Sequence, residues 1–188
     1  MDIATILGFL NPVKWIQTAV RYFRRARFHI YFDPDETFHT RRLVDLNMQL
    51  GCFVHVMVEN RGAEVAKGCS GQLIRIERMV ERGDFERHPG FVSPVVLKWA
   101  HESDLGPRDI DPDIPRRLDL CVAVQPRPQY FSLMTDRTPS GNQIDFPPGT
   151  YRATVRVKAE NAAPEDSTFQ IVYEGIWNEF TVMQVSDS

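Results

Sequence analysis

Apolar and polar residues alternate without a break along "GTYRATVRVKAE" (residues 149–160), a rhythm that an α-helix cannot accommodate. The apolar side chains stand at Tyr151, Ala153, Val155 and Val157. Successive side chains leave a β-strand on opposite faces, whereas a helix repeats about every 3.6 residues. The stretch therefore predicts a strand with one buried face and one solvated face.

The same period of two recurs along the chain after residue 27. The expected strands cover residues 28–32, 52–59, 71–79, 94–101, 117–124, 149–160, 169–173 and 180–182. The stretch "FVHVMVENRGAEVAKGCSGQLIRIE" (53–77) predicts a hairpin or a crossing from one sheet to another. About eight strands without a convincing internal helix predict an all-β fold, an antiparallel immunoglobulin-like β-sandwich. Three connections, residues 80–93, 102–116 and 126–149, are longer than usual for such a fold.

Residues 1–27 have a different rhythm and are predicted to be an amphipathic helical segment in front of a sandwich domain at 28–188. Asn11-Pro12 reads as a helix start, because Asn caps free N–H groups and Pro lacks the N–H that would stay unpaired there. The residues through which this helix is expected to bind a protein or a membrane surface are Val13, Trp15, Ile16, Val20, Arg21, Tyr22, Phe23, Arg24 and Arg25. They combine an apolar face, aromatic residues at its rim and a basic tail.

The helix has two alternative uses. It packs on its own sandwich, a twin subunit or a partner protein, or it lies on an anionic membrane surface, with its arginines supplying much of the attraction. Asp2 and the absence of an early base argue against a secretory signal, and Lys14 and Pro12 interrupt the segment too early for a membrane span.

Charge is distributed unevenly along the chain. Residues 1–30 contain five of the 22 basic residues and one of the 25 acidic residues, so the remainder holds 17 basic and 24 acidic residues. The predicted body is therefore acidic, which argues against nucleic acid as a partner because phosphate binding needs clustered cations. Arg152, Arg156 and Lys158 form only a short basic stripe, interpreted as the solvated face of a strand.

Two segments carry the resemblance of this chain to known domains. "VHVMVENRGAEVAKGCSGQL" and "FPPGTYRATVRV" are similar to sequences of CARDB-type and fibronectin-III-like sandwich domains, over residues 50–185. In such folds a corner tyrosine hydrogen-bonds to upstream backbone, and the resemblance places Tyr151 in that role. It implies binding or adhesion more often than catalysis and transfers no site residues.

Motifs for chemistry are weak. Asp109, Asp111 and Asp113 alternate as in a calcium loop, but the turn glycine and the final glutamate are missing. "RGD" at residues 82–84 has the composition of a turn. Since the chain has no recognisable catalytic motif, neither an enzyme nor a cofactor is predicted.

The three cysteines, Cys52, Cys69 and Cys121, cannot all pair within one chain and stand in apolar strand contexts. Free cysteine behaves as a small buried hydrophobe, so reduced thiols in a cytoplasmic protein are expected. A Cys52–Cys121 or Cys69–Cys121 bridge in an exported protein is the alternative.

These observations predict a cytoplasmic, non-catalytic binding or scaffolding module. Its N-terminal helix would attach it to a partner protein, to its own copy or to a membrane surface. The alternatives are a membrane-acting effector that uses its N-terminal segment, and an exported, calcium-dependent adhesin.

Overall fold

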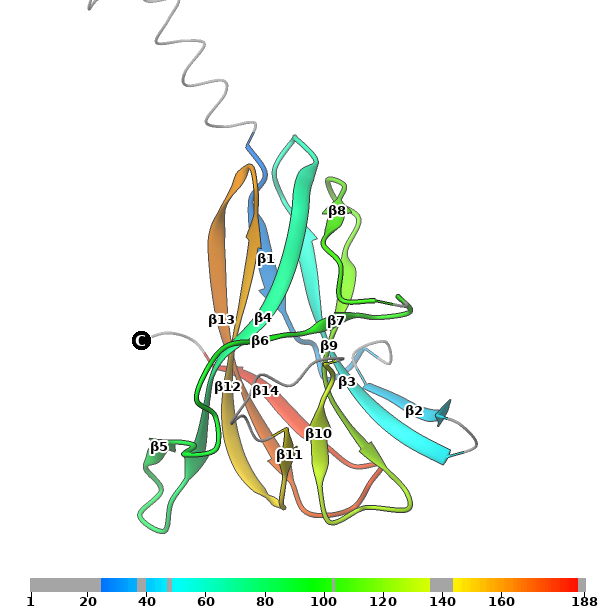
Figure 1. Ribbon diagram of the computed structural model, residues 1–188, viewed down its shortest axis with the longest axis vertical. Helices are drawn as coiled ribbons and strands as arrows, with labels where there is room; N and C mark the ends of the chain where they lie inside the picture. Colours follow the sequence, from blue (N-terminus) through cyan, green and yellow to red (C-terminus); the bar gives the residue numbers. More distant parts are fainter. Residues whose placement is uncertain (1–24, 37–39, 47–48, 103, 136–143, 186–188) are drawn as a thin grey trace, which may run out of the picture.

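The computed structural model describes residues 25–36, 40–46, 49–102, 104–135 and 144–185. Within these ranges every regular element is a β-strand, and the strands pair antiparallel into two sheets (Figure 1). The predicted all-β class is confirmed for this part of the chain. The predicted N-terminal helix lies outside the described residues, apart from its last residues, 25–27.

The first sheet has β3 and β9 at its centre. Its strands in spatial order are β1 (Phe28–Tyr31), β3 (Gln49–Asn60), β9 (Arg116–Val124), β10 (Phe131–Leu133) and β11 (Asp145–Phe146). Two further strands lengthen it: β2 (Thr40–Leu46) pairs with β3, and β7 (Lys98–Trp99) pairs with β9.

The second sheet has β12 and β4 at its centre. Its order is β14 (Thr181–Val185), β13 (Ala162–Tyr173), β12 (Gly149–Ala159), β4 (Ala66–Met79) and β5 (Phe85–Arg87). Two short strands, β6 (Val95–Val96) and β8 (Arg108–Ile110), also pair with β4. Long antiparallel ladders join β4, β12 and β13.

The described residues form 14 strands, more than the about eight expected from periodicity. Four of the additional strands, β5, β8, β10 and β11, are short segments within the three long connections. The stretch at residues 53–77 is a crossing between sheets, since β3 belongs to the first sheet and β4 to the second.

The predicted strand at residues 94–101 is divided between the two sheets. β6 pairs with β4 and β7 pairs with β9, so the chain crosses from the second sheet to the first within five residues (Figure 1). Consecutive amides mark the crossing: Leu97 N donates to Gly71 O at 3.0 Å, and Lys98 N donates to Met134 O at 3.1 Å. The alternation of buried Val95, Leu97 and Trp99 is nevertheless as predicted, because the core lies between the sheets.

The turn after β3 is organised by the buried side chain of Asn60. Its Oδ1 accepts hydrogen bonds from Arg27 N at 3.1 Å and Gly62 N at 3.0 Å. Its Nδ2 donates to Glu64 O at 2.7 Å and to Ile110 O at 3.1 Å. One amide group thus joins four backbone sites from three separate segments, which is how a buried polar side chain avoids a desolvation penalty.

Gly62 is required where the N-terminal segment meets this turn. A Cβ at position 62 would lie 2.1 Å from the carbonyl oxygen of Arg25 and 2.6 Å from Cα of Ala26, both backbone atoms that cannot rotate away. Ala26 is buried in the core cluster, and Arg27 O accepts a hydrogen bond from Arg61 N at 2.8 Å. Residues 25–27, predicted as the end of the helical segment, therefore contact the sandwich.

The core fills the space between the sheets with alternate residues of both. Tyr151, Ala153, Val155 and Val157, the apolar positions of the opening stretch, are all fully buried. Tyr151 Oη donates to Pro147 O at 2.8 Å, four residues upstream, which is the hydrogen bond that was predicted for this tyrosine. Its ring packs edge-on against Phe131.

All three cysteines are free and buried, so neither alternative disulfide is present. Burial raises the pKa of the Cys69 thiol to about 11 and raises that of Cys121 as well. Because the thiolate is the reactive form, a raised pKa lowers reactivity at neutral pH. We expect almost no labelling of the native protein by a thiol reagent at pH 8, and labelling of three thiols after denaturation. Fast labelling of any cysteine in the native protein would contradict this arrangement.

Candidate functional site

The structure does not test the residues of the N-terminal helix that were predicted to attach the protein to a partner or a membrane. All of them except Arg25 lie outside the described residues. Arg25 is exposed and lines a shallow hollow together with Glu64, Glu160 and Asn161. Its surroundings in the body are thus acidic and polar.

The predicted aspartate loop does not form a metal centre in the structure. Asp109 Oδ1 accepts a hydrogen bond from Gly68 N at 2.9 Å, which ties β8 to β4. Among the described residues, which include Asp111 and Asp113, no group of three or more His, Cys, Asp or Glu side chains is placed to hold a metal ion. The Asp109 side chain instead holds the backbone of Gly68.

The "RGD" segment forms a turn, as its composition predicted. Gly83 has a left-handed φ of 82°, and hydrogen bonds of 2.9 Å join Gly83 N to Val80 O and Val80 N to Asp84 O. No feature of this turn points to a ligand.

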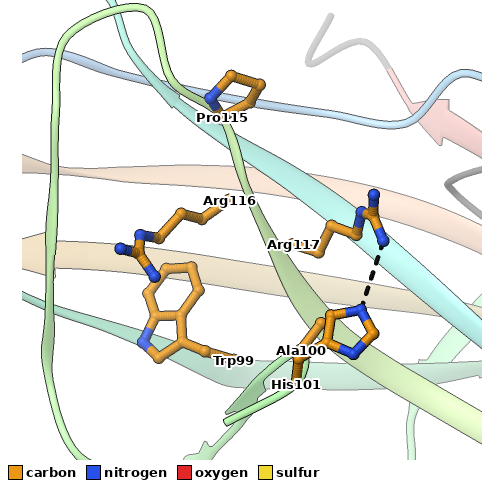
Figure 2. A pocket seen from close by; sticks show the side chains of 6 residues that line it. All are labelled: Trp99, Ala100, His101, Pro115, Arg116 and Arg117. Carbon is orange, nitrogen blue, oxygen red and sulfur yellow. Dashed lines mark hydrogen bonds between the residues drawn. The ribbon is translucent and has the colours of Figure 1, made fainter.

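A hollow of about 320 Å³ lies where the chain leaves β7 and enters β9 (Figure 2). Its lining residues come from two short segments, Trp99, Ala100 and His101 on one side and Pro115, Arg116 and Arg117 on the other. The two segments are held together by strand pairing, since Trp99 is opposite Leu118 and Ala100 N donates to Arg117 O at 2.9 Å. We name this feature the arginine hollow.

The arginine hollow presents cations above a buried aromatic residue. Arg116 and Arg117 are neighbours on β9 and extend in opposite directions, Arg117 toward His101 (Figure 2). Arg117 Nη1 lies 3.5 Å from His101 Nε2, and the Trp99 side chain is almost entirely buried. None of the six lining residues carries a carboxylate, a thiol or a hydroxyl group. The lining therefore consists of two guanidinium groups, one imidazole and apolar surface.

Acidic residues next to the arginine hollow are engaged with a third arginine. Glu102 Oε2 accepts from Arg108 Nη2 at 3.2 Å, whereas Glu102 Oε1 is 3.5 Å from Arg116 Nη1. Asp104 also accepts from Arg108, at 2.8 Å. Hydrogen bonds from the Gly106 N–H and from Arg108 lower the pKa of Asp104, and its bonds with Glu102 and Asp104 raise the pKa of Arg108. Glu102 is therefore shared between two guanidinium groups.

The backbone on both sides of the arginine hollow adopts left-handed conformations at residues other than glycine. His101 has a φ of 66° and Asp113 a φ of 59°. Such conformations are uncommon for residues with a Cβ and cost on the order of 1 kcal/mol each. Neighbouring hydrogen bonds hold both turns, with Glu102 N donating to Trp99 O at 3.2 Å and Asp113 N donating to Asn60 O at 3.1 Å. Backbone hydrogen bonds thus hold the turns at His101 and Asp113.

A buried polar pair lies two residues further along β9. His55 Nδ1 and Asp119 Oδ1 are 2.6 Å apart, and their side chains are only 4% and 7% exposed. His55 stacks on Phe53, with ring centroids 6.0 Å apart. The other ring nitrogen of His55, Nε2, is buried and has no hydrogen-bond partner. Because residues 117 and 119 are two positions apart on one strand, Arg117 and Asp119 lie on the same face of the first sheet.

Sequence reasoning missed both of these features. No local pattern pairs His55 with Asp119, which lies 64 residues away in the sequence and on the neighbouring strand. A signal existed, because His55 and Asp119 each interrupt an apolar strand, in "VHV" and "LDL". The arginine hollow gave no comparable signal, since Arg116 and Arg117 resemble the other paired bases of this chain.

No family model, no curated protein and no solved structure matches this chain. No helix among the described residues has the length and apolar character needed to cross a membrane.

Proposed function

We propose that this chain is a non-catalytic binding module, an immunoglobulin-like β-sandwich that its N-terminal amphipathic helix attaches to a protein partner, to a second copy or to a membrane surface. The observation that carries this proposal is the chemistry of the arginine hollow. Its lining offers guanidinium and imidazole groups over a buried indole, without a carboxylate, thiol or hydroxyl group. Such a lining supports recognition in preference to bond breaking.

The immunoglobulin-like character of the sandwich is supported by its corner tyrosine. Tyr151 Oη bonds to Pro147 O at the entry to a late strand, as in domains of that type. Free, buried thiols support a reducing compartment such as the cytoplasm.

Deletion of residues 1–24 tests the attachment role. The described core draws on Ala26 and later residues, so we expect the shortened protein to remain folded with a nearly unchanged melting temperature. The deletion ends at residue 24 because Arg27 is hydrogen-bonded to Asn60 and to Arg61 N, and the backbone of residues 25 and 26 lies close to Gly62. We expect it to abolish co-sedimentation with anionic vesicles, self-association or partner capture, whichever the intact chain shows.

A control variant tests the contribution of the arginines to attachment separately from that of the apolar face. Arg21→Ala with Arg24→Ala retains the apolar face and should weaken attachment to anionic vesicles more than attachment to a protein. Unfolding of the deletion variant would make the segment part of the sandwich, and unchanged attachment would place the binding surface on the body.

A further inference from the structure

We propose that this chain associates head to tail, with the N-terminal segment of one copy bound to the apolar surface at the far end of the sandwich of a second copy. This proposal rests on the proposed function, because it names the surface and the partner for the attachment segment, residues 1–24. The surface belongs to the described part of the chain, and the segment is known by its sequence.

Three loops meet at one end of the sandwich, at the bottom of Figure 1. They connect β9 to β10, β11 to β12 and β13 to β14, and they cover residues 125–130, 147–148 and 174–180. Tyr173 Oη donates a hydrogen bond to Pro128 O, which joins the end of β13 to the first loop. A Cβ on Gly175 would lie 3.2 Å from Pro148 Cγ and 3.7 Å from Pro128 O, so the three loops are in contact. We name this surface the loop end.

The loop end exposes large apolar side chains. Tyr130 is 42% exposed and Ile176 is 45% exposed. Trp177 is only partly buried, and so is Phe180, whose ring stacks on Tyr173 with centroids 4.8 Å apart. Single exposed apolar residues are ordinary, but several gathered on contacting loops are typical of an interaction surface. The loop end is therefore a surface suited to an apolar partner.

The charges around the loop end favour a basic partner. Glu174 and Glu179 are exposed before and after Ile176 in the third loop, and Arg127 is the basic residue of the three loops. Residues 13–24 of the N-terminal segment contain no acid and have three bases, Lys14, Arg21 and Arg24. Opposite charges on two surfaces guide them together and favour this pairing over others.

The sequence of the N-terminal segment is that of a helix that binds through one face. Its apolar residues Val13, Ile16, Val20 and Phe23 are spaced three, four and three residues apart, so a helix places them in one row. Amphipathic helices use such rows to bind apolar surfaces of other proteins. The predicted apolar row and its basic neighbours thus match the loop end in both polarity and charge.

The segment of one chain cannot reach its own loop end as a helix. Arg25 lines the same hollow as Ala162, the first residue of β13, whereas the loop end begins after Tyr173, the last residue of β13 (Figure 1). β13 has 12 residues, which span about 40 Å. Val13 lies twelve residues before Arg25, which is about 18 Å along a helix. The loop end therefore receives the segment of another copy.

A contact of this kind joins two different surfaces, so each copy keeps one free segment and one free loop end. Such heterologous contacts build rings or open filaments, whereas a symmetric contact closes after two copies. We expect oligomers that grow with protein concentration and that weaken as salt screens the arginines and glutamates.

The test compares the full chain with two full-length variants by analytical ultracentrifugation at increasing protein concentration. The loop variant carries Tyr130→Ser with Ile176→Ser, and the segment variant carries Ile16→Ser with Val20→Ser. We expect the wild type to form oligomers, and each variant to associate at least about tenfold more weakly, because apolar area that the contact would bury has been removed. Melting temperatures establish that the variants are folded.

Mixing the two variants tests whether the contact is head to tail. The segment variant keeps an intact loop end and the loop variant keeps an intact segment, so their mixture should form a complex of two chains that grows no further. Undiminished association of the segment variant would reveal contacts between loop ends, and undiminished association of the loop variant would reveal contacts between segments. Either result overturns the proposal, as does a wild type that stays monomeric or a mixture that does not associate.

Val92→Ser with Ile114→Ser is the matched control. These two side chains are 55% and 59% exposed but lie outside the loop end. The control variant should associate like the wild type, and a loss equal to that of the loop variant would reduce the effect to general surface hydrophobicity and overturn the proposal. Glu174→Gln with Glu179→Gln should weaken association at low salt and make it less sensitive to salt.

Sedimentation with phosphatidylcholine vesicles that contain or lack phosphatidylserine separates the failure of this proposal from that of the proposed function. A monomeric wild type that binds the anionic vesicles, and loses this binding when residues 1–24 are deleted, retains the attachment role and excludes head-to-tail pairing. Loss of vesicle binding in the loop variant would assign the loop end to a lipid surface, which also overturns the proposal.

Discussion

Replacing Asn60 with leucine is expected to destabilise the protein by about 3–5 kcal/mol. The side chain is fully buried, and its amide satisfies the N–H groups of Arg27 and Gly62 and the carbonyl groups of Glu64 and Ile110. Leucine has a similar volume but leaves these backbone groups without partners in a dry turn. Each buried group left unpaired costs about 1–3 kcal/mol.

Urea denaturation of Asn60→Leu measures this loss, with Asn161→Leu as the matched control. Asn161 also bridges two backbone groups, accepting from Lys67 N and donating to Val65 O at 2.9 Å each, but it is partly exposed. Water can replace its bonds, so we expect a loss of about 1 kcal/mol there. Equal losses of stability at both positions would show that the burial of Asn60 does not determine the cost of losing its hydrogen bonds.

If Asn60→Leu fails to fold, Asn60→Asp keeps the experiment informative. An aspartate retains the two acceptor bonds but turns a carboxylate toward Glu64 O and Ile110 O, so its protonated form is favoured in the folded state. The folded pKa would then exceed the unfolded one, and stability would fall as the pH rises from the unfolded pKa through the folded pKa. We expect Asn60→Asp to be more stable at pH 4 than at pH 7, relative to the wild type.

The buried His55–Asp119 pair gives the second large effect. Asp119→Ala is expected to cost about 3 kcal/mol or more, because it leaves a buried imidazole without its partner at Nδ1 and adds to the unpaired Nε2. The double variant His55→Phe with Asp119→Leu removes every polar atom of the pair. Since two buried polar groups are costly to desolvate, we expect this double variant to be far more stable than the sum of its single variants predicts.

A double-mutant cycle under urea denaturation measures the coupling. Arg156 and Asp166 provide the comparison, as a pair with a 2.7 Å contact whose side chains are 43% and 38% exposed. We expect the exposed pair to couple weakly, because solvent screens it, and the buried pair to couple clearly more strongly. Additive effects of the His55 and Asp119 substitutions would contradict the arrangement.

The inward and outward faces of the long strands could be predicted from the sequence, because the alternation of side chains is a local property. Tyr151 to Val157 and Val95 to Trp99 are buried where the alternation placed them. What alternation does not encode is the partner strand. The chain from β6 to β7 faces one core throughout, so nothing in its pattern reveals that it changes sheets.

The candidate site depends on contacts between distant segments and was missed for that reason. His55 meets Asp119 across a strand pair, and His101 meets Arg117 across a different one. The register of these pairs follows from the whole sheet, including an irregularity between Val54 and His55 that no local pattern signals. The attachment helix, by contrast, was proposed from local periodicity and stays a prediction.

The run from Val95 to Trp99 also has a consequence for how the protein comes apart. Leu97 N donates to Gly71 O in β4 of the second sheet, whereas Lys98 N donates to Met134 O, the residue that follows β10 of the first sheet. Neither sheet can then separate from the other without disturbing hydrogen bonds that the β6–β7 segment makes with both. Amide hydrogens of β4 and β9 should accordingly exchange with solvent at a common rate set by a single global opening, rather than one layer after the other.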